Sequence, residues 1–127
     1  MPYLLLIDNQ EFEHALFQEV LEDLNIQLVS ARNGQQALQL INNIPALCLI
    51  FLNPKLPNVH HEELFESIKT IRPNIPVIAY SAVAEEDFIK QCYKTGYHEV
   101  ILKPVDLSLI TNTIIRYTSL NCKTIMI

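Results

Sequence analysis

Short apolar runs alternate with longer amphipathic segments along the whole chain. Residues 3–7 (YLLLI) and 47–52 (LCLIFL) are uninterrupted apolar runs, which are typical of strands buried on both faces of a sheet. Shorter runs at 26–31, 77–80 and 100–102 predict three further strands. Because a helical segment follows each strand, the pattern predicts a parallel sheet with helices on both faces.

The predicted helices are recognised by apolar residues spaced three or four positions apart. After the first strand, Phe12, Leu16, Val20 and Leu24 recur every four residues, and we expect this stripe to pack on the sheet. The same spacing predicts four more helices, around residues 37–41, 64–71, 88–92 and 107–117.

Length and composition indicate one folded domain. The 127 residues fit a single domain over 1–127, with a core of about 3–117 and a tail at 118–127. The tail is interpreted either as a frayed helix end or as an apolar strip that docks a partner. Half of the residues are hydrophobic and 18% are charged, which supports a packed core rather than disorder.

Charge and cysteine usage restrict the partners and the compartment. The net charge is −5 and the nine Lys and Arg residues are scattered, which argues against nucleic-acid binding. No apolar run approaches the roughly 20 residues that span a bilayer, so we expect no membrane insertion. The three cysteines, Cys48, Cys92 and Cys122, form no CxxC pair, and we interpret them as free thiols of a cytoplasmic protein.

Polar residues follow four of the five predicted strands. Asp8 and Asn9 come after the first strand, Asn53 after the third, Ser81 after the fourth and Lys103 after the fifth. In open parallel sheets, ligands and chemistry gather at the carboxyl ends of the strands. These five side chains are therefore the predicted functional pocket.

Five motifs, in this order and spacing, resemble the receiver domains of two-component response regulators. They are LLLIDNQ, ARNGQQAL, FLNPKLPN, PVIAYSA and TGYHEVILKPVD, and the resemblance runs from Tyr3 to about Tyr117. It implies a flavodoxin-like (βα)5 fold, a three-layer αβα sandwich whose five-stranded parallel sheet has the order 2-1-3-4-5.

The resemblance also implies a role for each pocket position. The family has two acidic residues after the first strand, a phosphoacceptor aspartate after the third and Ser or Thr after the fourth; here these positions hold Asp8 and Asn9, Asn53, and Ser81. Lys103-Pro104 keeps the family's Lys-Pro pair, whose peptide bond is cis. Because an amide replaces the phosphoacceptor, the chain resembles an atypical, pseudo-receiver member.

Two further positions depart from the family pattern. The aromatic residue that takes part in switching, three positions before the lysine, is replaced by Val100. A glycine typical of the loop after the third strand is replaced by His61. Both replacements affect how such a domain would change shape.

The chemistry of the pocket follows from its side chains. A neutral carboxamide is a poor nucleophile, so Asn53 is not expected to accept a phosphoryl group. Mg²⁺ prefers carboxylates and water, and only Asp8 remains as a weak candidate ligand, so we expect no cofactor and weak or absent Mg²⁺ binding. Asp8 is interpreted as structural, and we hypothesise that Lys103 pairs with it in the space left by metal and phosphate. Asn53 is either a neutral isostere of aspartate or a mimic of one fixed switch state.

Three functions are compatible with these residues. The first is a non-enzymatic signalling module in or beside a phosphorelay, which binds a protein partner through the fourth helix, fifth strand and fifth helix; a homodimer stays open. The second is a receiver that docks a histidine kinase or phosphotransfer protein as a competitor or atypical phosphoacceptor. The third, a flavodoxin-like enzyme or nucleotide binder, is disfavoured because the chain has two glycines and no glycine-rich phosphate loop.

Overall fold

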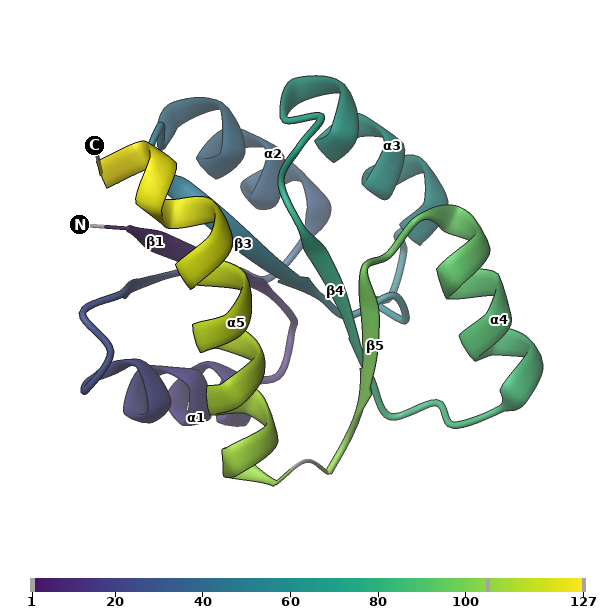
Figure 1. Cartoon of the computed structure of the whole chain (residues 1–127). Helices are drawn as coiled ribbons and strands as arrows, with labels where there is room; N and C mark the ends of the chain where they lie inside the picture. The colour runs from purple at the N-terminus through teal and green to yellow at the C-terminus, as the bar shows by residue number, and fades with distance from the viewer. Residues whose placement is uncertain (1, 105, 127) are drawn as a thin grey trace.

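The computed structural model describes residues 2–104 and 106–126, with side chains as far as residue 118. Within these residues the chain forms five strands and five helices in strict alternation (Figure 1). The strands are β1 (Tyr3–Ile7), β2 (Gln27–Ala31), β3 (Leu47–Leu52), β4 (Val77–Ser81) and β5 (Glu99–Leu102). The helices are α1 (Glu11–Leu21), α2 (Gly34–Asn43), α3 (His61–Ile71), α4 (Glu86–Thr95) and α5 (Leu107–Met126).

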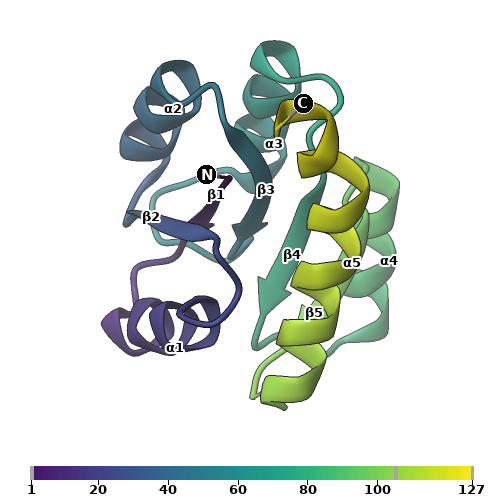
Figure 2. The ribbon, with the colours of Figure 1, turned by 60° about the vertical axis from the view of Figure 1, so that its left-hand side comes forward.

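The strands form one parallel sheet in the order β2-β1-β3-β4-β5, which confirms the predicted fold class. Helices α1 and α5 cover one face of the sheet, and α2, α3 and α4 cover the other (Figures 1 and 2). The central strand β3 is buried at all six positions, as its uninterrupted apolar sequence predicts.

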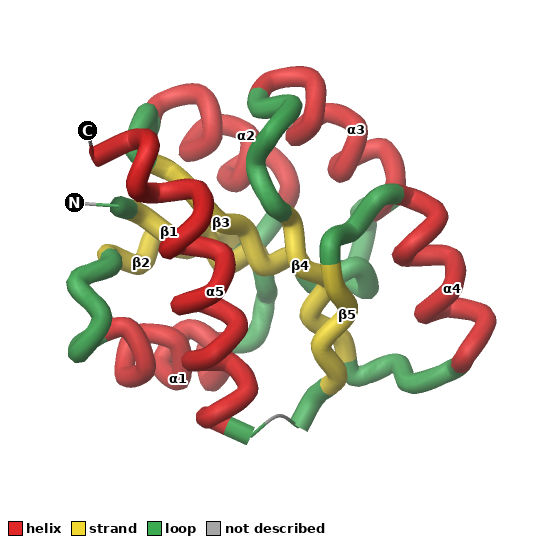
Figure 3. The backbone as a smooth tube through the Cα atoms, in the orientation of Figure 1, coloured by secondary structure: helices red, strands yellow, loops and turns green. Residues whose placement is uncertain are grey.

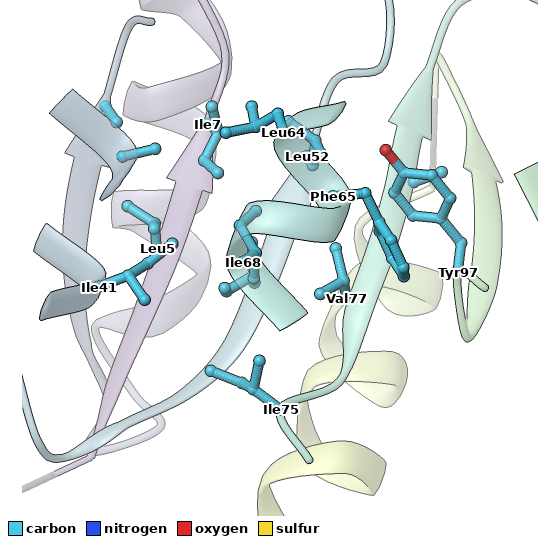
Figure 4. Close-up of a cluster of buried hydrophobic side chains, with 14 of the residues drawn as sticks. Leu5, Ile7, Ile41, Leu52, Leu64, Phe65, Ile68, Ile75, Val77 and Tyr97 are labelled. Atoms are coloured by element: carbon cyan, nitrogen blue, oxygen red, sulfur yellow. The ribbon is translucent and has the colours of Figure 1, made fainter. Parts of the chain in front are cut away.

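Each face of the sheet has its own hydrophobic core. Under α1 and α5, the rings of Phe17, Phe51 and Tyr80 form an edge-to-face trio with centroids 5.0 to 6.0 Å apart. Under α2, α3 and α4, alternate residues of the same strands pack against the helix side chains shown in Figure 4. The period-two alternation of a strand divides its apolar residues between these two cores.

Hydrogen bonds beyond the strand ends bring the predicted pocket residues to one edge of the sheet. The amide of Asp8 donates to Ala31 O, and the amide of Asn53 donates to Ile7 O, at 3.0 and 2.9 Å. The amide of Lys103 donates to Ser81 O at 2.8 Å. The parallel ladder therefore continues one residue past several strands, into the loops that Figure 3 shows between strands and helices.

The first helix buries only part of the stripe that its sequence predicts, because Leu16, Val20 and Leu24 pack partly buried against the core while Phe12 does not. Phe12 is 72% exposed, and the buried residues of α1 are instead Glu13, His14, Phe17 and Leu21. Phe17 and Leu21 fill the core below α1 and so fix the rotation of the helix about its axis. This rotation also turns Glu13 and His14, one turn earlier, toward the interior. The prediction was therefore wrong for Phe12, and the structure places two polar side chains, Glu13 and His14, in the interior.

Two other sequence interpretations are changed. The last helix continues to Met126, so residues 118–126 extend α5, while the proposed docking role of the tail lies outside the described side chains. Cys48 is disulfide-bonded and Cys92 is free and buried, so the interpretation of Cys48 as a free thiol was wrong. The side chain of Cys122 lies outside the described residues. No helix in the described part of the chain is long and apolar enough to cross a bilayer.

Candidate functional site

The centre of the pocket is an ion pair between Lys103 and Asp8. The Lys103 Nζ lies 2.7 Å from Asp8 Oδ2, and the two side chains are 9% and 0% exposed. This confirms the pairing that the sequence analysis hypothesised. Because both charges are largely removed from water, each depends on the other for compensation.

Both carboxylate oxygens of Asp8 have hydrogen-bond partners. Its Oδ1 accepts the Gln10 amide at 3.0 Å, and the Gln10 Oε1 in turn accepts from Lys103 Nζ at 3.3 Å. Gln10 is the residue before α1 and its side chain makes no helix cap. Asp8 therefore fixes the turn from β1 into α1 while it holds the lysine.

A buried histidine anchors the same turn from behind. His14 is 5% exposed, and its Nε2 lies 2.7 Å from the carbonyl oxygen of Asp8 while its Nδ1 lies 2.8 Å from Ser30 Oγ. A carbonyl only accepts, so Nε2 carries the proton and donates. His14 thus joins the end of β1 to β2 beneath the pocket.

Glu13 brings a second carboxylate to the lysine. Its Oε1 lies 3.9 Å from Lys103 Nζ, and its Oε2 accepts the Tyr80 hydroxyl at 2.5 Å. Asp8 is therefore not the only acidic side chain beside Lys103, because the rotation of α1 turns Glu13 inward to 6% exposure. Burial first, and the Glu13 hydrogen bond second, raise the pKa of Tyr80, so its phenol stays protonated and donates.

The lysine also lies against the ring of Tyr80. Its Nζ is 4.8 Å from the ring centroid, within the range of a cation–π contact. The ammonium is therefore surrounded by Asp8, Gln10, Glu13 and the aromatic face. The Lys103–Pro104 peptide bond that follows is cis.

The side chains of Asn53 and Ser81 are buried, and each accepts a hydrogen bond from a backbone amide of its own loop. Asn53 Oδ1 accepts the amide of Lys55 at 2.9 Å, and Ser81 Oγ accepts the amide of Val83 at 3.0 Å. These are the local side-chain turns that Asn and Ser commonly form. Asn9 is exposed. The charged centre of the pocket is thus built from Asp8, Lys103 and Glu13, while Asn53 and Ser81 stabilise the loops that follow β3 and β4.

Val100 and His61 fill space on the other side of the sheet. Val100 is half-buried, and its amide donates to the Tyr93 hydroxyl at 3.4 Å, which places a side chain of α4 over the edge strand. The His61 ring lies 6.0 Å from the rings of both Phe88 and Tyr97. Burial lowers the pKa of His61, which favours the neutral ring in this aromatic setting.

The pocket does not fit a divalent metal ion. Asp8 uses one carboxylate oxygen for Lys103 and the other for the Gln10 amide, and Asn53 uses its oxygen for Lys55. Across the described residues, no three His, Cys, Asp or Glu side chains are grouped to hold a metal. A hard cation would have to displace a buried ammonium from its carboxylates.

These features define a doubly wound α/β domain with a charged pocket at the carboxyl edge of its sheet. Residues 4–115 match the family model described as the response regulator receiver domain. The chain belongs to this family.

Known relatives cover nearly the whole chain. Sporulation initiation phosphotransferase F of Bacillus subtilis is 30% identical over 117 residues, which are 92% of this chain and 94% of that protein. The receiver domain of HemR from Leptospira biflexa aligns with a TM-score of 0.82 at 24% identity, over 94% of this chain and 95% of that one. A two-component response regulator from Clostridium difficile aligns with a TM-score of 0.86 at 20% identity, over 94% and 97%.

Sequence reasoning missed Gln10, Glu13, His14 and Tyr80. One signal was available: Phe17, Leu21 and Leu24 also form a helical stripe, and extending it backwards places Glu13 and His14 on its face. A polar residue on an apolar helix face points to a buried polar contact. For Tyr80, the signal is a phenol at a strand position that must be buried and so needs a hydrogen-bond acceptor.

Proposed function

We propose that this receiver domain signals without aspartyl phosphorylation, by binding a protein partner in or beside a two-component phosphorelay. The proposal rests chiefly on the buried ion pair between Lys103 and Asp8, whose charged atoms lie 2.7 Å apart. In this pair the Lys103 ammonium occupies the position that a metal ion and a phosphoryl group would need. Asn53 adds to this, since a carboxamide cannot readily form the acyl phosphate. No catalytic role is proposed for any residue of the pocket.

The surface formed by α4, β5 and α5 is the proposed binding site for the partner. Tyr93 on α4 and Ile115 on α5 are 51% and 44% exposed. The exposed fork between Arg116 and Glu99 joins α5 to the edge strand in the same region. A surface that combines an aromatic side chain with a fixed charged rim is typical of protein interfaces.

The proposal predicts that the wild-type chain stays unmodified by small phosphodonors. After incubation with acetyl phosphate and Mg²⁺, we expect the intact mass to remain that of the free chain, because no carboxylate stands at position 53. A receiver domain with an aspartate at the equivalent position is the positive control and should gain one phosphoryl group. The same adduct on the wild-type chain would disprove the proposal.

A second candidate is favoured by exposed apolar residues in the first turns of α1 and α5. Phe12 at the start of α1 is 72% exposed, and Leu107 and Leu109 at the start of α5 are 48% and 49% exposed. The contact between Lys103 and Gln10 brings these two helix starts together. Receiver domains interact with histidine kinases or phosphotransfer proteins. Such an apolar surface would let this chain bind one of these proteins in competition with other receiver domains.

The competitor function predicts inhibition that depends on Phe12. The chain should slow phosphotransfer from a histidine phosphotransfer protein to an active receiver, and Phe12→Ala should weaken that inhibition about tenfold, as expected for an aromatic anchor worth about 1.4 kcal/mol. Gln35→Ala, at an exposed position of α2 that lies in neither proposed surface, is the control. Equal inhibition by the wild type and Phe12→Ala would exclude this surface.

A further inference from the structure

Glu13 reaches the pocket from a helix and not from a strand end. Both of its carboxylate oxygens face charged or polar partners, since Oε2 accepts the Tyr80 hydroxyl at 2.5 Å and Oε1 lies 3.9 Å from Lys103 Nζ. A carboxylate at 6% exposure is costly unless it is paired in this way. Tyr80 and Lys103 together therefore compensate the buried Glu13 carboxylate.

We infer that Glu13 and Tyr80 form a second lock, which holds Lys103 against Asp8 and keeps the pocket closed even if the missing acidic residues are restored. The inference rests on the proposed function, since it concerns how the same pocket is kept from accepting phosphate. Glu13 and Tyr80 are positioning residues here: they act on a ligand only through Lys103 and through the charge that Glu13 adds.

The charges around Lys103 oppose an incoming anion. For a phosphoryl group or its analogue to bind, the ammonium must leave its two carboxylates and turn to the new oxygens. Glu13 retains a negative charge beside that position, and like charges in a poorly hydrated site repel strongly. Restoring aspartates at positions 9 and 53 adds metal ligands but leaves this obstacle in place.

The first turns of α1, which carry Glu13, are anchored both before and after that residue. Before Glu13, the Arg32 guanidinium forms a two-bonded fork with Glu11, at 2.7 and 2.8 Å, and ties the helix start to the end of β2. One turn after Glu13, the Phe17 ring packs 5.3 Å from the Tyr80 ring. The helix turns that carry Glu13 are therefore anchored on both sides of it, and its carboxylate is held by Tyr80 and Lys103.

The lock also reaches the loop that leads into α4. Tyr80 is the residue before Ser81, whose hydroxyl accepts the amide of Val83 in that loop. A side chain that fixes Tyr80 to α1 therefore also restrains the carboxyl end of β4. Release of Glu13 should loosen both the lysine and this loop.

The test compares beryllofluoride binding in a background where the acidic positions are restored. In Asn9→Asp/Asn53→Asp, we expect binding of beryllofluoride with Mg²⁺ to stay weak, and addition of Glu13→Gln should tighten it at least tenfold. The glutamine keeps an oxygen for the Tyr80 hydroxyl and removes only the charge. Tyr80→Phe in the same background frees Glu13 without removing its charge, and should give a smaller gain. Titration calorimetry measures each dissociation constant, and thermal melts establish that each variant is folded.

Glu19→Gln is the matched control, because Glu19 is an exposed residue of the same helix, and it should leave binding unchanged. Equal affinity with and without Glu13→Gln would overturn the lock, and so would failure of the triple variant to bind. Neither result bears on the proposed function, which fails only if the wild-type chain itself is phosphorylated.

Discussion

Lys103→Met is expected to lower the free energy of unfolding by about 3–5 kcal/mol, the cost of breaking a buried ion pair from one side. Methionine nearly matches the length of lysine but leaves Asp8, at 0% exposure, without its cation. Glu13 loses its charged neighbour at the same time. The penalty therefore comes from uncompensated buried carboxylates and not from lost packing.

Urea unfolding at neutral pH measures this difference, with the exposed Lys90→Met as control. Lys90 pairs with Glu86 one helical turn away, with side chains 69% and 82% exposed, and such surface pairs contribute little. Adding Asp8→Asn to Lys103→Met should recover part of the loss, because it removes one of the stranded charges. A Lys103→Met variant as stable as the wild type would show that the pair does not support the fold.

Phe17→Ala is expected to cost about 3–5 kcal/mol, as for a large aromatic ring removed from a tightly packed core. Phe17 is fully buried, and its ring contacts the edges or faces of Phe51 and Tyr80 at 5.0 and 5.3 Å. The cavity would lie directly behind the pocket. We therefore also expect α1 to exchange its amide hydrogens faster, since Phe17 fixes the helix that carries Glu13.

Phe12→Ala is the matched comparison on the same helix. Phe12 is 72% exposed, and its removal should change the free energy of unfolding by no more than about 0.5 kcal/mol. Denaturant unfolding of both variants checks the orientation of α1 directly. Similar losses for the two phenylalanines, or a larger loss for Phe12→Ala, would contradict the observed face of the helix.

Most of the fold could be predicted from local pattern. The runs YLLLI and LCLIFL define the central strands because burial on both faces leaves no polar position in them. Strand order came from the family resemblance, because apolar periodicity does not specify which strands are neighbours. The pairing of Lys103 with Asp8 could be hypothesised because both follow strands that end at the same edge.

The buried face of α1 could not be predicted from its apolar residues alone. EFEHALFQEVLEDL contains two stripes of similar strength, one through Phe12 and Leu16 and one through Phe17 and Leu21. The choice depends on which ring fits between Phe51 and Tyr80 of the neighbouring strands, which is a property of the assembled core.

The alternating strands and helices, and the polar residues at the strand ends, can be read from the amino-acid sequence alone. That Glu13, His14 and Tyr80 join this edge depends on the assembled fold, because the rotation of one helix, set by packing far along it, carries polar side chains into the interior. There they must find partners, and the partners they find are Lys103, Ser30 and the backbone of Asp8.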